Sequence, residues 1–343
     1  MTQLIDGGSW DLPNCSNTEE FIDIPPAKIF LSTIVDSKMN LDLTLTQTAL
    51  LTVATGLEVI VLFLAAVQWW QILTKVSNEK RRNKLYFLIS LFPITTVCCY
   101  IGMLSPRSAL VLNSVGVFYT LTCMAVLIAL LKHLFGGRKG FSTKLSYDDK
   151  GINFQSPPFC CCCKCLPEPA GTEKNLRRVE WLVLQAPIVR ALVVLYNIFA
   201  VAEYRENAHS CLQISEIAAV VSLLLAIFGM HTMARLTTDK LRSYGFMTMF
   251  RMVDITLLFY TAQQPMIFEN LIRFGVIDCG PILSAIDNGR YICNFVIICQ
   301  LTLLSLLSTF CLSPVRSALF NHVNPDAPIQ EVKTEQQTIF TDE

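Results

Sequence analysis

Long apolar runs, separated by shorter polar stretches, are the dominant pattern along this chain of 343 residues. Each run holds about twenty residues, the length that an α-helix needs to cross the hydrocarbon core of a bilayer. Such a run predicts a helix because, in lipid, a helix satisfies every backbone polar group within its own segment. The sequence predicts seven spans, over Ala49–Leu73, Leu85–Leu104, Ala109–Leu131, Trp181–Ala202, Ile214–Met233, Phe246–Pro265 and Tyr291–Leu312.

These runs divide the chain into a membrane domain and two polar tails. We expect an all-α, polytopic fold in which residues 46–312 form a domain of seven transmembrane helices. Residues 1–45 form an amino-terminal tail, residues 313–343 form a carboxyl-terminal tail, and a long connection, 132–180, joins the third and fourth spans. The second span has the weakest signal, because Pro93 lies in its middle and has no backbone N–H to donate.

Basic residues are unevenly distributed among the connections, and this distribution predicts the side of the membrane on which each connection lies. The excess of Lys and Arg marks the cytosolic side of membrane proteins. The first, third and fifth connections carry that excess, so we expect an extracellular amino terminus and a cytosolic carboxyl terminus. The basic residues of these connections are Lys75, Lys80, Arg81, Arg82, Lys84, Lys132, Arg138, Lys139, Lys144, Lys150, Lys164, Lys174, Arg177, Arg178, Arg235, Lys240 and Arg242, against Arg107, Arg205, Arg273 and Arg290 in the alternate ones.

The composition agrees with a membrane protein and excludes several classes of function. Apolar residues make up 52% of the chain and charged residues 16%, whereas soluble domains carry about a quarter charged residues. No basic stretch interleaved with aromatic residues indicates a nucleic-acid partner. The phosphate-binding loop of ATP-driven pumps and the common hydrolase motifs are missing from the sequence, and its four histidines are scattered. We therefore expect no enzyme, no metal site and no cofactor.

Two features of the polar segments fit the predicted extracellular side. Asn14, Cys15 and Ser16 form a sequon for N-glycosylation, which requires exposure outside the cytosol. Cys15, Cys211 and Cys279 are all expected on that side, where a disulfide can persist. With three candidates, the sequence does not assign the pair.

A cluster of cysteines lies in the predicted cytosolic connection. Five of the fourteen cysteines of the chain fall together in a basic segment that is bounded by Pro158 and Pro167. Beside a bilayer, such thiols are typical sites of reversible acylation, and each acyl chain holds the segment against the membrane. A metal site is the rival interpretation, but adjacent cysteines do not all reach one tetrahedral ion. The predicted lipidation sites are Cys160, Cys161, Cys162, Cys163 and Cys165.

Charged and amide side chains inside the predicted spans are candidates for contact with a solute. Charges are costly in a bilayer and usually mark a pathway or a paired site. A local pair or a bond between helices is the alternative for each of them. Pro265 strengthens the case for its neighbours, since it frees a carbonyl of the preceding turn. The predicted substrate-binding residues are Glu58, Arg190, Arg251, Asp254, Gln263 and Gln264.

Glu58 and Arg190 each lie about half-way through a predicted span and could meet inside the membrane. A guanidinium at that depth needs a carboxylate or an anionic solute as its partner. We predict that Glu58 and Arg190 form a gate, which an anionic solute opens by competing for Arg190. A purely structural ion pair between the two helices is the alternative.

The order of several short motifs along most of the chain resembles the alpha subunit of the organic solute transporter. The matching segments are Lys80-Arg81-Arg82, Pro106-Arg107-Ser108, Phe135-Gly136-Gly137, the cysteine segment Pro158–Pro167, Gln185-Ala186-Pro187, Gln264-Pro265-x-Ile267-Phe268 and Cys279-Gly280-Pro281. The resemblance implies seven spans and facilitated diffusion of amphipathic organic anions such as bile acids and conjugated steroids. It also implies a place in the plasma membrane and a single-span beta subunit as partner; a homo-oligomer is a further expectation.

Two other functions stay open on the sequence alone. Seven spans with an extracellular amino terminus also describe a signalling receptor, although the third span ends in Leu131-Lys132-His133 rather than in an acidic-Arg-Tyr motif. A membrane scaffold or trafficking regulator that acts through its lipidated connection is the second alternative. Either would be supported if transport fails while ligand-triggered signalling or partner recruitment survives.

Overall fold

The computed structural model describes residues 27, 28, 30, 31, 42–147, 152, 170–204, 209–238, 241, 244–277, 283–313 and 320. Its regular elements over these residues are helices, so the expected all-α fold is confirmed there. They are α2 (Asp42–Lys75), α3 (Glu79–Ile89), α4 (Leu91–Leu104), η1 (Pro106–Ser108), α5 (Ala109–Leu134), α6 (Arg138–Tyr147), α7 (Glu173–Tyr204), α8 (His209–Thr237), α9 (Phe246–Gln263), η5 (Gln264–Phe268), α10 (Glu269–Arg273) and α11 (Ala285–Cys311).

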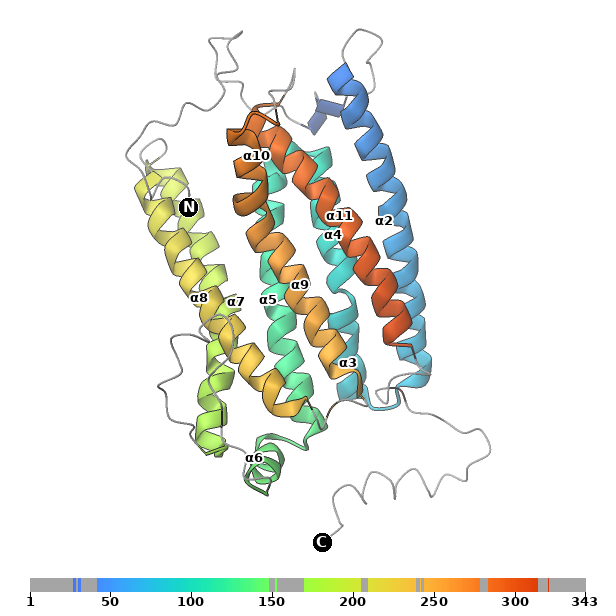
Figure 1. The fold of residues 1–343 in the computed structure, drawn as a ribbon, viewed down its shortest axis with the longest axis vertical. Helices are drawn as coiled ribbons and strands as arrows, with labels where there is room; N and C mark the ends of the chain where they lie inside the picture. Colours follow the sequence, from blue (N-terminus) through green and yellow to red (C-terminus); the bar gives the residue numbers. More distant parts are fainter. Residues whose placement is uncertain are drawn as a thin grey trace.

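Long helices run side by side and alternate in direction (Figure 1). Six of them are long and apolar enough to cross a membrane, and each coincides with a predicted span. Their exposed side chains are largely apolar, as on α2 and α7, which suits contact with lipid tails. The six are Leu45–Lys75, Glu79–Leu104, Pro106–Leu134, Glu173–Ala200, Cys211–Thr237 and Ala285–Cys311.

The remaining predicted span, Phe246–Pro265, is helical but is not among these six. It forms α9, whose apolar character is lowered by Arg251 and Asp254. This helix packs against α5 and α11 in the middle of the bundle (Figure 1). A helix surrounded by other helices tolerates polar residues better than one that faces lipid, because its polar groups find partners inside the protein.

Most of the described basic residues lie at one end of the bundle, which we call the basic end. There α2, α5 and α8 finish, and α3, α7 and α9 begin (Figure 1). Arg107, Arg273 and Arg290 lie at the other end, in or next to η1, α10 and α11. The charge asymmetry of the sequence is therefore an asymmetry of the fold. Described basic residues of the basic end are Lys75, Lys80, Arg81, Arg82, Lys84, Lys132, Arg138, Lys139, Lys174, Arg177, Arg178 and Arg235.

Pro93 coincides with a short interruption of the second span, one turn before the proline. The interruption is at Ser90, between α3 and α4, because Pro93 has no N–H to donate to the carbonyl of Ile89. Pro93 then occupies the first turn of α4, where a missing N–H is tolerated.

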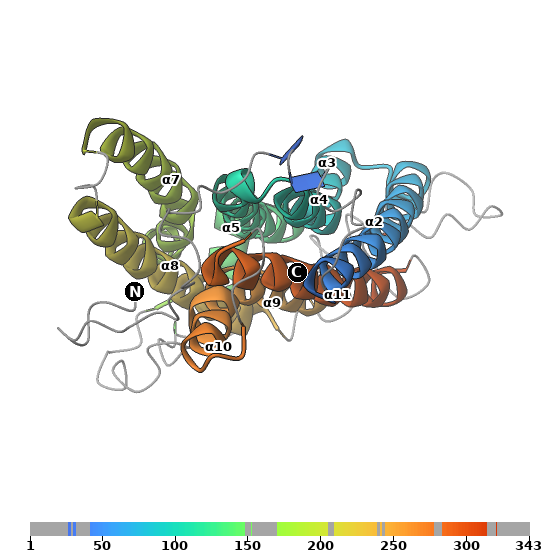
Figure 2. The same ribbon diagram turned by 90° about the horizontal axis from the view of Figure 1, so that it is seen from above.

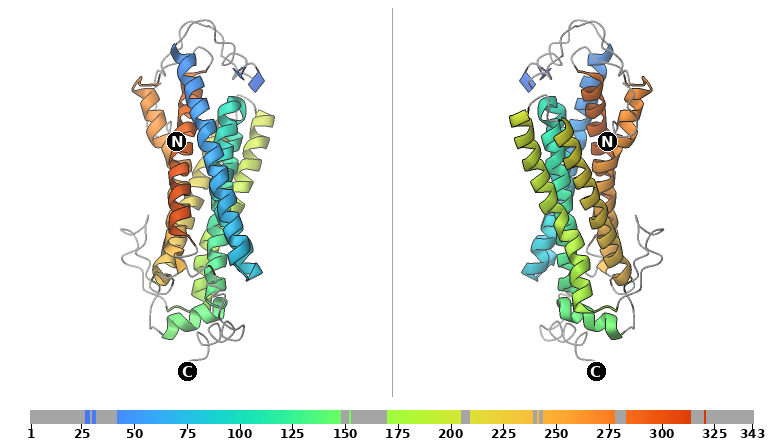
Figure 3. Two further views of the ribbon diagram at one scale, coloured as in Figure 1. Left: turned by 90° about the vertical axis from the view of Figure 1, so that its right-hand side faces the viewer. Right: turned by 90° about the vertical axis from the view of Figure 1, so that its left-hand side faces the viewer.

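A buried carboxylate joins three helices at the basic end. Glu180 of α7 is 1% exposed, and its Oε2 accepts hydrogen bonds from Lys132 Nζ at 3.2 Å and from Arg138 Nη2 at 2.8 Å. The hydrogen bond and the charge of Glu180 raise the pKa of Arg138. This contact anchors α6, which lies across the end of the bundle after a turn through Gly136 and Gly137 (Figure 3). The start of the long connection is thereby tied to α7.

Helices α7 and α8 form a tightly packed pair, the α7–α8 hairpin, at one side of the molecule (Figure 2). Gln185 Nε2 donates to the carbonyl of Ser222 at 3.1 Å, and Ser222 Oγ donates to Gln185 Oε1 at 3.2 Å. Gly229 allows the closest approach, since a Cβ there would lie 3.0 Å from Leu182 Cβ and 3.1 Å from the carbonyl oxygen of Val179. The hairpin therefore behaves as one packed unit.

We predict that Gly229→Val destabilises the protein, because the larger side chain separates α7 from α8. Overpacking of this kind costs about 1–3 kcal/mol of unfolding free energy. Gly56→Val is the matched control, since a Cβ at Gly56 meets no atom within 4 Å. Thermal unfolding in detergent should show a lower midpoint for the first variant alone, and equal midpoints would contradict the packing described here.

Candidate functional site

A cavity of about 260 Å³ lies between the α7–α8 hairpin and the helices α5 and α9. Its volume is close to the lower limit for small-molecule sites. The consecutive elements α7, α8, α9 and η5 meet there with α5, which lies before the long connection. The lining residues are Leu110, Asn113, Ser114, Val117 and Leu121 of α5; Ala186, Arg190, Val194 and Asn197 of α7; Glu216, Ala219, Val220, Ser222 and Leu223 of α8; and Tyr260, Thr261, Gln264 and Pro265 of α9 and η5.

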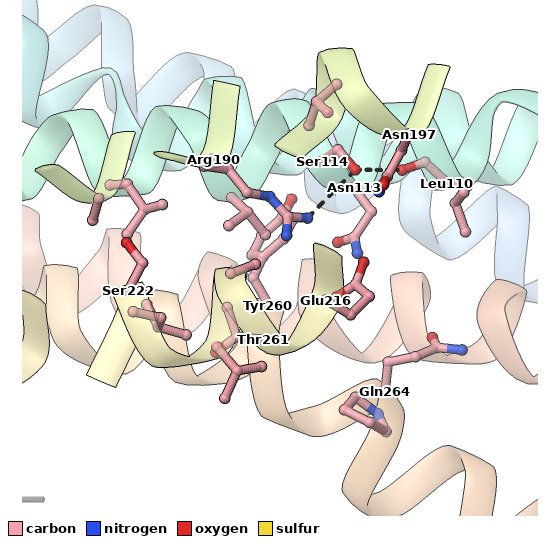
Figure 4. Close-up of a pocket in the computed structure, with 18 residues that line it drawn as sticks. Leu110, Asn113, Ser114, Arg190, Asn197, Glu216, Ser222, Tyr260, Thr261 and Gln264 are labelled. Carbon is pink, nitrogen blue, oxygen red and sulfur yellow. Dashed lines mark hydrogen bonds between the residues drawn. The ribbon is translucent and has the colours of Figure 1, made fainter. Parts of the chain in front are cut away.

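Arg190 is the central side chain of this site, which we call the Arg190 cavity (Figure 4). Its Nη2 donates to Ser114 Oγ at 3.5 Å, a long hydrogen bond, and its Nε is buried without a partner. The carboxylate of Glu216 lies near enough to act on its charge. A guanidinium offers five N–H donors, so Arg190 keeps donors that an anion in the cavity could use.

The walls of the Arg190 cavity have both polar and apolar character. Leu110, Val117 and Leu121 of α5, with Val194 and Leu223 of the hairpin, supply apolar surface. Polar groups from α5 and η5 lie around the same space as the guanidinium (Figure 4). A few convergent polar groups within an apolar wall are typical of sites that bind an amphipathic molecule.

The polypeptide changes its helical form where it borders the cavity. After Gln263 the helix widens into the π-helical segment η5, which begins with Gln264 and Pro265. Proline withholds an N–H and displaces the preceding carbonyl, so a wider turn relieves the conflict. Single π-helical turns are frequent at functional sites. The sequence prediction that Pro265 disturbs the helix beside a polar group is consistent with this geometry.

Tyr260 connects the cavity to the helices behind it. Its ring lines the cavity and packs against Gly116 of α5, where a Cβ would lie 2.5 Å from the ring. Its hydroxyl contacts Cys99 Sγ at 2.9 Å and donates to the carbonyl oxygen of Thr95, both on α4. A side chain held at both ends gives the cavity a fixed wall.

The structure brings together two of the six predicted substrate-binding residues. Arg190 and Gln264 both line the cavity. Gln263 is 8% exposed and is not a lining residue, and its Oε1 has no hydrogen-bond partner. The other three predicted residues lie elsewhere in the bundle.

Glu58 does not pair with Arg190, so the predicted gate between them is wrong in this structure. Glu58 lies on α2, buried against α4, with Thr96 as a polar neighbour. Helix α2 and the α7–α8 hairpin are on opposite sides of the bundle (Figures 1 and 2). Depth along a span was read correctly from the sequence, but the sequence does not say which helices are neighbours.

Arg251 and Asp254 are also outside the cavity. Asp254 Oδ2 lies 3.6 Å from Nε2 of His231 on α8, and the charge of Arg251, three residues earlier on the same helix, also acts on Asp254. Arg251 is exposed, one turn earlier on α9. The Asp254 contact is therefore a link between two helices.

Sequence reasoning missed Glu216, Asn113 and His231. Glu216 is the third residue of a predicted span, and ionisable residues at that position usually reach the membrane surface, so its partner was not apparent. Asn113 carries no charge in an otherwise apolar run. The histidines form no motif in the sequence. His231 contacts Asp254 only because α8 and α9 lie close together at this point.

Several predicted sites lie outside the described residues. They are the sequon residue Asn14, the cysteines of the cytosolic connection (Cys160, Cys161, Cys162, Cys163 and Cys165) and two of the candidate disulfide cysteines, Cys15 and Cys279. The third candidate, Cys211, has a free thiol.

The all-helical fold, the six apolar helices and a cavity within the bundle define a multi-pass membrane protein. Residues 50–316 match the family described as "Organic solute transporter Ostalpha". The chain belongs to this organic solute transporter alpha family, as the sequence motifs suggested, and a role in transport across a membrane follows.

Relatives from Caenorhabditis elegans support the assignment. The chain is 48% identical to organic solute transporter alpha-like protein 3 over 96% of its own length and 93% of that protein. It is 35% identical to organic solute transporter alpha-like protein 1, over 73% and 65% of the two chains. It is 31% identical to organic solute transporter alpha-like protein 2, over 90% and 88%. No solved structure shows significant similarity.

Proposed function

We propose that this protein is a transporter subunit for amphipathic organic anions, such as bile acids or conjugated steroids, and that the Arg190 cavity binds the anionic group. The observation that carries the proposal is a guanidinium with available donors in a cavity whose walls combine apolar side chains with a few polar groups. Arginine suits this role because its planar fork matches the geometry of a carboxylate or a sulfate.

The size of the cavity supports an amphipathic solute. Pockets that enclose a drug-sized molecule have about 300–1,000 Å³. This cavity has about 260 Å³, so it would enclose the charged group and only part of the apolar body. The remainder would lie against the apolar residues of α5 and the α7–α8 hairpin. Burial of that surface contributes about 25 cal/mol per Å², without any directional requirement, and therefore allows solutes of varied shape.

In the proposed gate, Glu216 replaces Glu58 as the carboxylate partner of Arg190. It is the carboxylate that acts on Arg190, and it comes from the opposite helix of the hairpin. An incoming anion would compete with Glu216 for the guanidinium, so binding would replace one partner of Arg190 by another. No ATP-binding motif accompanies the site, and facilitated diffusion down the solute gradient is the mechanism that we propose.

We propose that the protein has seven spans. Elements α9, η5 and α10 form the one that is less apolar than the others. Its central position between α5 and α11 supports this count, because neighbouring helices shield its polar residues from lipid. With the basic end in the cytosol, the amino terminus is extracellular. We propose the plasma membrane as its location and a single-span beta subunit as its partner; the exposed apolar side chains of α2 and α7 offer surface for such a contact or for a second copy.

Replacement of Arg190 tests the proposed site. We predict that Arg190→Gln lowers uptake of labelled steroid sulfate at least about tenfold, because a charge-assisted hydrogen bond contributes about 1.5–3 kcal/mol. Arg190→Lys should restore part of the activity, since it keeps the charge but loses the fork. Uptake is measured in cells or proteoliposomes, with and without a single-span partner.

The control for this experiment is Arg178→Gln, which removes an exposed arginine from the same helix. It should leave uptake near the wild-type level. Surface expression of each variant separates lost transport from lost folding. Full transport by Arg190→Gln at normal expression would refute the proposed role of the cavity.

Glycosylation tests the proposed orientation. We predict that Asn14 carries a glycan, so Asn14→Gln should abolish the mobility shift that a glycosidase produces in the wild type. The reason is that the basic end faces the cytosol and places residues 1–45 outside. Accessibility of the amino terminus to protease on the cytosolic side would show that the orientation is inverted.

Acyl-exchange labelling tests the cysteine segment. We predict that wild-type protein carries acyl groups and that replacing Cys160, Cys161, Cys162, Cys163 and Cys165 by Ser removes them and reduces delivery to the cell surface. Several chains together anchor a segment far more firmly than one. Cys211→Ser is the control, because this free thiol lies in α8. An unlabelled wild-type segment with stoichiometric zinc would favour the metal interpretation.

A further inference from the structure

His231 and Asp254 form a polar contact between α8 and α9. Their nearest atoms, Nε2 and Oδ2, are 3.6 Å apart, and the side chains are 23% and 29% exposed. The ring of Phe250 on α9 packs edge-on against the imidazole, with centroids 5.0 Å apart. Phe250 and Asp254, one turn apart on α9, thus both contact His231 of α8.

This contact lies below the Arg190 cavity, toward the basic end. The cavity is lined on α8 by residues up to Leu223, and on α9 by residues from Tyr260 onward. His231 therefore lies about 12 Å beyond the cavity along α8, and Asp254 about 9 Å before it along α9, at 1.5 Å per residue. Between them, Ala226, Met230 and Leu257 are buried. The two helices approach each other toward this end and diverge toward the other (Figure 1).

A hydrogen bond to the backbone of α8 orients the His231 ring. His231 Nδ1 lies 3.0 Å from the carbonyl oxygen of Ile227, which only accepts, so Nδ1 carries a hydrogen. The ring orientation that this bond fixes places Nε2 toward the Asp254 carboxyl group, at 3.6 Å. Other charged groups on the surrounding helices are Arg235 of α8, Arg251 of α9 and Glu180 of α7, which Lys132 and Arg138 hold.

We propose that His231 and Asp254 form a latch that holds the α7–α8 hairpin against α9 and closes the Arg190 cavity toward the basic end. The latch rests on the proposed transport function, because it explains how solute in the cavity is kept from that side of the membrane. The hairpin is suited to move as a body, since α7 and α8 are packed on each other more closely than α7 is packed on α5 or α8 on α9. Release of the latch would let α8 swing away from α9, with the contact of Glu180 on α7 with Lys132 on α5 as the pivot, and would open the cavity at this end.

A metal bridge provides the test. Asp254→His places two imidazoles across the α8–α9 contact, and imidazole pairs bind Ni²⁺. In proteoliposomes, Ni²⁺ should reduce uptake of labelled steroid sulfate by this variant about tenfold, within the usual range of coupling between two sites, and chelation should reverse the effect. The double variant His231→Gln with Asp254→His keeps a single imidazole, so it controls for Ni²⁺ bound at cysteines elsewhere. It should show no inhibition.

Hydrogen–deuterium exchange tests the latch independently of any transport assay. His231→Ala should increase exchange in the second half of α8 and the first half of α9, and Ni²⁺ should decrease it in Asp254→His alone. Ni²⁺ protection of these segments without inhibition would overturn the latch. Exchange that is unchanged in His231→Ala would also overturn it. If wild type moves no steroid sulfate but the exchange results hold, the proposed function fails and the contact between α8 and α9 stands.

Discussion

The close packing of α7 on α8 is the interaction on which the arrangement of the site depends. Gly229 lets the two helices approach until a Cβ would collide, and the reciprocal hydrogen bonds of Gln185 and Ser222 fix their register. Arg190 and Glu216 project from opposite members of this pair into one cavity. If the two helices packed less closely, the distance between the Arg190 guanidinium and the Glu216 carboxylate would not be fixed.

The cost of burying polar groups among apolar helices explains much of the remaining structure. Glu180 is almost fully buried, and it is tolerated because Lys132 and Arg138 both bind it. Tyr260 is buried with its hydroxyl engaged by α4. Other buried polar atoms lack a hydrogen-bond partner, among them both carboxylate oxygens of Glu58, Oε1 of Gln263 and Nε of Arg190, whose Nη2 makes only a long bond to Ser114. Of these groups, Arg190 is the cation that lines the cavity, and its unused donors are what the proposed anionic solute would bind.

The elements around the cavity differ in how firmly they are held. Helices α4, α5 and α9 are joined through Tyr260 and Gly116, so one wall of the cavity belongs to the main bundle. The opposite wall belongs to the hairpin, which meets α9 through His231 and Asp254. A cavity between one fixed wall and one separately packed wall can open toward either end when the second wall tilts. The π-helical turn at Gln264 lies on the fixed wall, where it widens the helix without loosening the packing.

The sequence by itself determined the helices and their grouping, because hydropathy over twenty residues and the placement of Lys and Arg are local properties of the chain. It singled out Arg190 and Gln264, which both line the cavity, and its motifs identified the family. It paired Glu58 with Arg190, which lie on different sides of the bundle, and it overlooked Glu216 and His231. Partners of these residues depend on which helices are neighbours, and apolar spans are too alike in pattern to encode that. Only the tertiary structure, through close approaches at Gly229 and Gly116, decided which side chains share a cavity.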